Sequence, residues 1–165
     1  MAPDFFSASG DVIEFSGRVR TGLTEGIEHS LGFLADRSGS QETTDAIRKA
    51  LDLCHDPEAT PSPEVIETLG GGWVGEEALA IGLYCALVAR NDLAQGVRLA
   101  VNHSGDSDST GAITGNILGA LLGEEAISAT WLDRLELHDV VRQVGEDLFD
   151  AFQGTAAWLK RYPPL

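Results

Sequence analysis

The sequence Asn102-His103-Ser104-Gly105-Asp106-Ser107-Asp108-Ser109-Thr110-Gly111-Ala112 places two carboxylates two residues apart, among hydroxyl side chains, where a helix is predicted to begin. From there glycine recurs at every fourth position, at Gly111, Gly115, Gly119 and Gly123. A helix with a glycine face lets another backbone approach closely, so we expect its N-terminus to be held rigidly. Asp106 and Asp108 would then present oxygen ligands of the kind that bind Mg²⁺, Mn²⁺ or Ca²⁺.

The residues alone leave two interpretations of this segment open. Asp, Ser and Thr commonly cap helices, and a negative charge at a helix N-terminus is stabilising by about 0.3–1 kcal/mol. Cation binding is the other interpretation, but an EF-hand loop is excluded. Its twelfth position would be Ile117, where a bidentate Glu is required. We expect the neighbouring His103 to cap or to pack.

The sequence lacks the residue patterns that other common catalytic sites require. The four histidines show no paired spacing and neither cysteine has a C-x-x-C partner, which argues against a transition-metal site. No serine or cysteine lies in a nucleophile elbow, and no glycine loop with a lysine is present to bind phosphate. Glu76 and Glu77 are expected to favour a helix N-terminus. The tryptophans are expected to anchor packing, and these are Trp73, Trp131 and Trp158.

The hydrophobic pattern is helical along the whole chain. Apolar residues follow helical spacing over 19–34, and the run over 76–88 is apolar on most sides, so we expect that helix near the domain centre. Helix starts are predicted at Thr43 or Thr44, at Ser62, at Asp92 and at Asp139. No convincing alternating strand, repeat or low-complexity block is present. The sequence therefore predicts an all-α fold.

Composition narrows the possible partners. The chain has 165 residues and a formal net charge of −15, from 26 acidic and 11 basic side chains. Because nucleic-acid partners require a basic surface, this balance argues against binding DNA or RNA. No apolar run approaches the roughly 18 residues of a membrane span, and no signal peptide is visible. Cys54 and Cys85 fall in apolar helical patterns, which predicts buried free thiols and a cytoplasmic location.

A family resemblance rests on these motifs. Gly105-Asp106-Ser107-Asp108-Ser109, followed by Gly111-Ala112-Ile113 and Gly115, resembles the C-terminal metal motif of the ADP-ribosylglycohydrolase family, which includes dinitrogenase-reductase-activating glycohydrolases. Gly72-Trp73-Val74-Gly75-Glu76-Glu77-Ala78-Leu79 is similar to the start of that family's penultimate helix. The resemblance is strong over about residues 65–150 and loose over 1–60. It implies that residues 1–165 form a partial domain of this family, a single compact domain of orthogonally packed helices.

The resemblance also implies an activity and a ligand set. Members of the family hydrolyse ADP-ribose from modified side chains or related conjugates, with two bound Mg²⁺ or Mn²⁺ ions. By resemblance the metal ligands of this chain are Asp106, Asp108 and Ser109, with Ser109 where the family more often has Thr. One carboxylate bridging two cations would explain the second Asp two residues from the first. No catalytic residue beyond these ligands and no substrate-binding residue is assigned.

One feature of the family is missing from this sequence. Complete members are much longer, and their N-terminal half supplies a second acidic set, a Glu and a Thr-Asp-Asp segment. This sequence contains no Asp-Asp pair. We therefore expect that a second chain carrying that half, or self-association, completes the site before it can act on ADP-ribose or an ADP-ribosylated substrate. The alternative function is a non-catalytic module that binds ADP-ribose or a partner.

Overall fold

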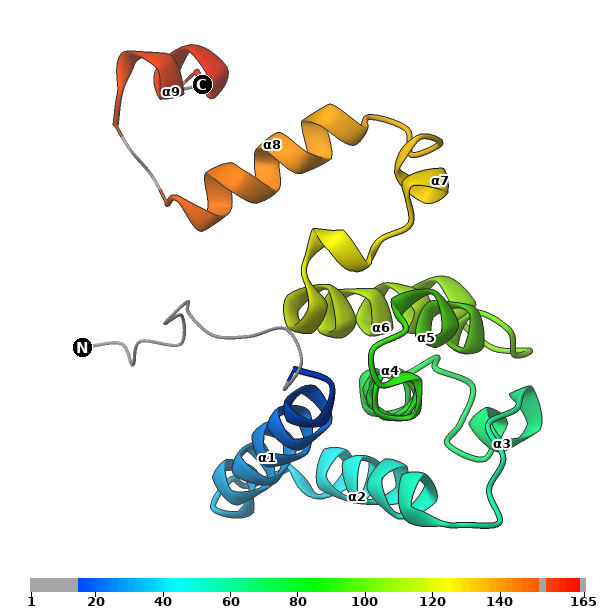
Figure 1. Cartoon of the computed structure of the whole chain (residues 1–165). Helices are drawn as coiled ribbons and strands as arrows, with labels where there is room; N and C mark the ends of the chain where they lie inside the picture. The colour runs from blue at the N-terminus through cyan, green and yellow to red at the C-terminus, as the bar shows by residue number, and fades with distance from the viewer. Residues whose placement is uncertain (1–14, 152–153, 164–165) are drawn as a thin grey trace. The chain divides into compact units, whose positions relative to one another are not determined.

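The computed structural model describes residues 15–151 and 154–163, with side chains from residue 22 onward. The described residues form α-helices and one 3-10 helix and contain no strand, which confirms the all-α prediction. The chain divides into two compact units, Met1–Ile127 and Ser128–Leu165, and each is described by itself. In chain order the elements are α1 (Phe15–Ala35), α2 (Gln41–His55), α3 (Pro63–Glu67), α4 (Gly75–Ala89), α5 (Leu93–Ala100), α6 (Ser107–Leu122), η1 (Glu124–Ala126), α7 (Ala129–Leu132), α8 (His138–Phe149) and α9 (Ala156–Arg161) (Figure 1).

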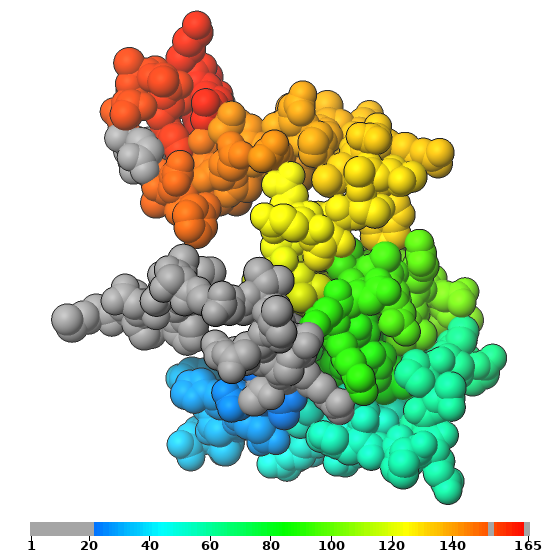
Figure 2. All heavy atoms as spheres, viewed as in Figure 1, coloured from blue at the N-terminus to red at the C-terminus, as the bar shows by residue number. Residues whose placement is uncertain are grey.

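Helix α4 is the centre of the first unit. Ten of its fifteen residues are buried, and it contacts α2, α5 and α6. Its sequence is apolar on nearly every side, as expected of a helix that others enclose, and its predicted central position is confirmed. Figure 1 shows α4 nearly end-on, with α6 on one side of it and α2 on the other. In the space-filling view the green atoms of the α4–α5 segment adjoin the turquoise atoms of the α2–α3 segment, and α2 contacts α4 (Figure 2).

Close packing against α6 depends on glycines in its neighbours. A Cβ on Gly82 of α4 would lie 2.5 Å from Cγ2 of Ile113, and a Cβ on Gly96 of α5 would overlap the Leu118 side chain. Because side chains at these two positions would displace α6 or its side chains, Gly82 and Gly96 allow the close approach of α4 and α5 to it.

The glycine face predicted for α6 itself is wrong beyond its first turn. A Cβ on Gly111 would lie 2.5 Å from Cγ1 of Val101, so that position does allow a close approach. A Cβ on Gly115 would meet only Cγ2 of Val97 at 3.9 Å, and one on Gly119 would meet nothing within 4 Å. The four-residue spacing is therefore not a packing surface along its whole length.

Two of the four predicted helix starts, those at Ser62 and Asp92, are correct. Ser62 and Asp92 accept hydrogen bonds from the third residue of their helices, at 3.4 and 2.9 Å. Helix α2, however, starts at Gln41, before both predicted threonines, and Thr44 is buried in its interior. Helix α8 starts at His138 rather than after Asp139. Both errors place the start too late, because a Thr or Asp inside the first turn resembles a cap in sequence.

No helix in the described part of the chain combines the length and apolarity needed to cross a bilayer.

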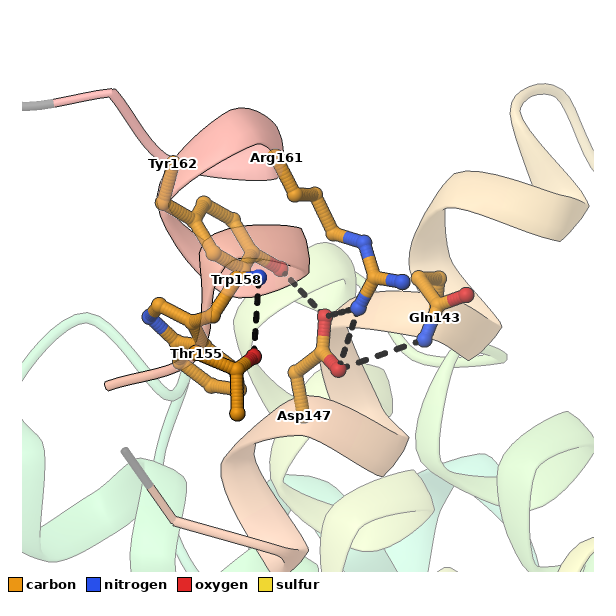
Figure 3. Close-up of polar contacts among 6 residues, drawn as sticks. All are labelled: Gln143, Asp147, Thr155, Trp158, Arg161 and Tyr162. Carbon is orange, nitrogen blue, oxygen red and sulfur yellow. Dashed lines mark hydrogen bonds and ion pairs between the residues drawn. The ribbon is translucent and has the colours of Figure 1, made fainter. Parts of the chain in front are cut away.

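In the second unit, a polar cluster around Asp147 joins α8 to α9 (Figure 3). The Asp147 side chain is only 10% exposed. Nη1 of Arg161 donates to both of its carboxylate oxygens at 2.6 Å, and the Tyr162 hydroxyl donates to Oδ2 at 2.9 Å. Gln143 donates to Oδ1 at 3.3 Å. Because a buried charge is stable only when it is paired and hydrogen-bonded, these contacts hold α9 against α8.

This cluster predicts that acid releases α9. Burial raises the pKa of the Asp147 carboxyl, but the hydrogen bonds from Arg161 and Tyr162 outweigh it, so this pKa lies below its ordinary value. Since the folded pKa is depressed, the contribution to stability is present above the unfolded value of about 4 and is lost as the pH falls through the folded pKa. With Trp73 and Trp131 replaced by Phe, the fluorescence of Trp158 should report this transition. Asp147→Asn should abolish its pH dependence, and a transition that persists in that variant would contradict the assignment.

Candidate functional site

Two loops meet at the start of α6. One is the glycine turn over residues 70–72, which precedes α4, and the other is the segment 103–106, between α5 and α6. The Asp106 amide donates to the Gly71 carbonyl at 2.8 Å. A Cβ on Gly105 would overlap the Gly71 carbonyl oxygen and lie 2.7 Å from its carbon. The two backbones are thus in direct contact, and only glycine at position 105 leaves room for it.

A hydrogen-bonded network supports the segment before Asp106. Nδ1 of His103 accepts from the Gly105 amide at 3.1 Å, so in the neutral ring the proton lies on Nε2, which can donate to the Thr110 hydroxyl at 3.0 Å. The Thr110 hydroxyl in turn donates to the Ala100 carbonyl at 2.7 Å. The Glu67 carboxylate accepts from the Ser104 amide at 3.0 Å. His103 therefore acts within the loop as a hydrogen-bonding residue.

Asp106 occupies the N-cap position of α6, but its side chain makes no capping hydrogen bond. Side-chain hydrogen bonds with Asp108 and then with the Ser109 hydroxyl are the main causes that lower the pKa of the Asp106 carboxyl. The side chains of the three sequence-predicted ligands, Asp106, Asp108 and Ser109, therefore lie close together in the first turn of α6. The Ser109 backbone lowers the pKa of Asp106 by a smaller amount, so Asp106 faces the N-terminus of α6 without a full capping hydrogen bond.

The donor chemistry of this cluster suits a hard divalent cation, since it consists of two carboxylates and a hydroxyl. Three ligands are too few to complete the coordination of such a cation. Among the residues that the structure describes, no group of three or more His, Cys, Asp or Glu side chains could hold a metal ion. Mg²⁺ needs near-octahedral coordination and is usually bound by one or two carboxylates, with water or substrate oxygens supplying the rest. The three residues fit one part of such a site.

Trp73 is the residue that sequence reasoning placed wrongly. Its side chain was expected to anchor packing, but Trp73 is 72% exposed and follows the glycine turn directly. A Cβ on Gly71 would lie 2.6 Å from Cδ1 of the indole, so the ring lies against the turn that holds Asp106. The signal that could have identified it is the run of three glycines before it, which leaves no neighbouring side chains to cover an indole. Trp131 and Trp158 are partly buried.

Trp73→Ala is expected to change the free energy of unfolding by less than about 0.5 kcal/mol, because an exposed side chain loses little on truncation. Urea denaturation followed by circular dichroism measures this. A loss of several kcal/mol would show that the indole is a packing anchor after all.

Comparison with known proteins gives consistent results. A model of the ADP-ribosylglycohydrolase family matches residues 12–157, which extends the similarity toward both ends of the chain. The ADP-ribosylarginine hydrolase Tri1 of Serratia proteamaculans (strain 568) is 42% identical over 53 residues, which cover 32% of this chain and 14% of Tri1. No solved structure matches the chain. The family model spans parts of both compact units, and the single partial domain over residues 1–165 remains a prediction.

Proposed function

Because this chain belongs to the ADP-ribosylglycohydrolase family, we propose that it takes part in hydrolysing an ADP-ribosyl bond at a site formed by Asp106, Asp108 and Ser109. The observation that carries the proposal is the Asp106 carboxylate, which is grouped with the Asp108 and Ser109 side chains. It stands at a helix N-terminus without capping it, although capping is the ordinary reason for an Asp there. A carboxylate held in place by its backbone and grouped with a second carboxylate and a hydroxyl is suited to binding a cation.

Two Mg²⁺ or Mn²⁺ ions are the proposed cofactors. When bound, they would supply Lewis acidity and lower the pKa of a water near the anomeric carbon. Asp106 and Asp108 would bind through their carboxylates and Ser109 through its hydroxyl. The contact between Gly71 and Asp106 would keep the first turn of α6 in position as the substrate enters.

The proposed substrate is an ADP-ribosylated side chain. The similarity to Tri1, an ADP-ribosylarginine hydrolase, favours an arginine linkage, although the matched segment is a small part of that protein. The exposed Trp73 indole beside the site offers an apolar face on which a base or a sugar could stack, a contact worth about 1–3 kcal/mol where bases stack on aromatic side chains.

The incomplete ligand set supports the further proposal that a second acidic segment completes the site, from a second chain carrying the family's N-terminal half or from self-association. The second candidate function is a non-catalytic module that binds ADP-ribose or a protein partner. The incomplete ligand set also favours this module, because three oxygen ligands alone would hold a cation weakly. A cytoplasmic location remains a proposal that rests on the two free cysteines, Cys54 and Cys85.

The test measures ADP-ribose release from an ADP-ribosylarginine protein. The chain is assayed alone and mixed with a polypeptide that carries the family's Glu and Thr-Asp-Asp segment, with Mn²⁺, with Mg²⁺ or with a chelator. Cation-dependent release in the mixture supports the enzyme. Calorimetry with ADP-ribose supplies the second measurement. Binding without release in any mixture would reject catalysis and favour the module.

A further inference from the structure

The Glu77 carboxylate closes the glycine turn. Glu77 lies in the first turn of α4, and its Oε2 accepts hydrogen bonds from two successive amides, Gly71 at 3.0 Å and Gly72 at 3.1 Å. A Cβ on Gly70 would lie 2.6 Å from Cγ of Glu77, so the side chain lies directly against the turn. Hydrogen bonds to an ionised acceptor are among the strongest that a neutral amide makes. Oε2 of Glu77 thus holds two successive amides of the turn in place.

The same turn holds Asp106. The Gly71 carbonyl accepts from the Asp106 amide, and Gly72, at φ +75°, packs where a Cβ would lie 2.8 Å from Cγ2 of Thr110 and 3.7 Å from Cβ of Asp106. Because the Asp106 side chain makes no capping bond, the position of this residue depends on its backbone contacts. A change in the turn would therefore move the candidate ligands.

We propose that Glu77 is a positioning residue for the Asp106 and Asp108 carboxylates. By holding the amides of Gly71 and Gly72, it keeps the Gly71 carbonyl directed at the Asp106 amide, and so sets where the first turn of α6 presents its ligands. This proposal depends on the proposed function only for the identity of the ligand that the two carboxylates bind. The positioning itself is a property of this chain.

Amide hydrogen exchange, measured by NMR, tests the positioning. In Glu77→Ala the amides of Gly71 and Gly72 should exchange about tenfold faster or more, as expected for losing hydrogen bonds to a charged group. The Asp106 amide should also exchange faster, because the Gly71 carbonyl to which it donates moves with the turn. Glu77→Gln keeps an acceptor oxygen and should restore slow exchange. Glu76→Ala is the matched control, since it removes the same charge from the same helical turn, and it should leave the three amides unchanged. If Glu77→Ala does not fold, Glu77→Asp replaces it, because the shorter side chain keeps the charge but does not span both amides.

Mn²⁺ binding, followed by electron paramagnetic resonance, is the second measurement. Glu77→Ala should weaken it about tenfold or more, the usual effect of removing a group that orients metal ligands. An unchanged Asp106 amide in Glu77→Ala or Glu77→Asp, or an equal effect of Glu76→Ala, would overturn the proposal. If the wild-type protein, alone and in the completed mixture, binds no Mn²⁺, the proposed cation site fails, and the exchange rates alone decide the role of Glu77.

Discussion

Gly105→Ala is expected to destabilise the protein by about 2–3 kcal/mol and to disrupt the candidate site, because there is no space for the added methyl group. Its Cβ would overlap the Gly71 carbonyl oxygen and lie 2.9 Å from the Gly71 Cα. All these atoms are backbone, so no side chain can rotate to make room. Relief requires the two loops to separate, which breaks the hydrogen bond between Asp106 and Gly71. Urea denaturation gives the loss of stability, and NMR shifts at Asp106 report the loop separation.

The same substitution elsewhere in the chain provides the control. Gly119→Ala adds a Cβ to α6 where nothing lies within 4 Å. In the interior of a helix, alanine is more stable than glycine by roughly 0.5–1 kcal/mol, so this variant should be stabilised. Opposite signs for the two substitutions would establish the loop contact. Equal and small effects would show that the loops separate without cost and that the close approach is not required.

Asp106→Asn and Asp108→Asn are each expected to reduce cation-dependent ADP-ribose release by the completed site about 100-fold or more. Removing a group that merely orients metal ligands usually costs 10–100-fold, and loss of a ligand should cost at least as much. Each substitution should reduce stability by no more than about 1 kcal/mol, the effect of losing a negative charge at a helix N-terminus, because Asp106 has no full capping hydrogen bond to lose. Release assays and thermal unfolding on the same samples separate the two effects.

Asp92→Asn is the matched control. Asp92 caps α5 through a hydrogen bond to the Gln95 amide, and Asn caps about equally well, so both stability and activity should be retained. Asp92→Ala should lose about 1 kcal/mol of stability, whereas Asp106→Ala should lose less, because it has no full capping hydrogen bond to lose. If Asp106→Ala were destabilised as much as Asp92→Ala, the carboxylate would be a helix cap and the proposed chemistry would lose its basis.

Much of the fold follows from local sequence. Helix α4 is apolar on nearly all sides and is the buried centre of its unit, as its composition predicts. Ser62 and Asp92 start their helices because a cap and its partner amide lie within three residues of each other. The predictions at Thr44 and Asp139 are wrong for a related reason, since a polar residue early in a helix has the same local pattern whether it precedes the first turn or lies within it.

The family motif placed Asp106, Asp108 and Ser109 at the start of a helix, and the structure has them there. What the motif did not identify is their support. Ser104 bonds to Glu67, which lies 37 positions earlier in the chain, and the turn that holds Asp106 is closed by Glu77. The contact between Ser104 and Glu67 has no sequence spacing by which to recognise it, because α4 and α5 intervene between the two residues.

The sequence by itself determined the helical class, the buried position of α4 and the acidic turn that opens α6, because each depends on residues that are neighbours in the chain. The tertiary structure alone decided that Trp73 is exposed, that the Gly71 carbonyl meets the Asp106 amide and that Asp147 joins α8 to α9. The physical reason is the same in each case. Exposure and long-range hydrogen bonds depend on which backbones meet, and that is fixed only when the helices have packed.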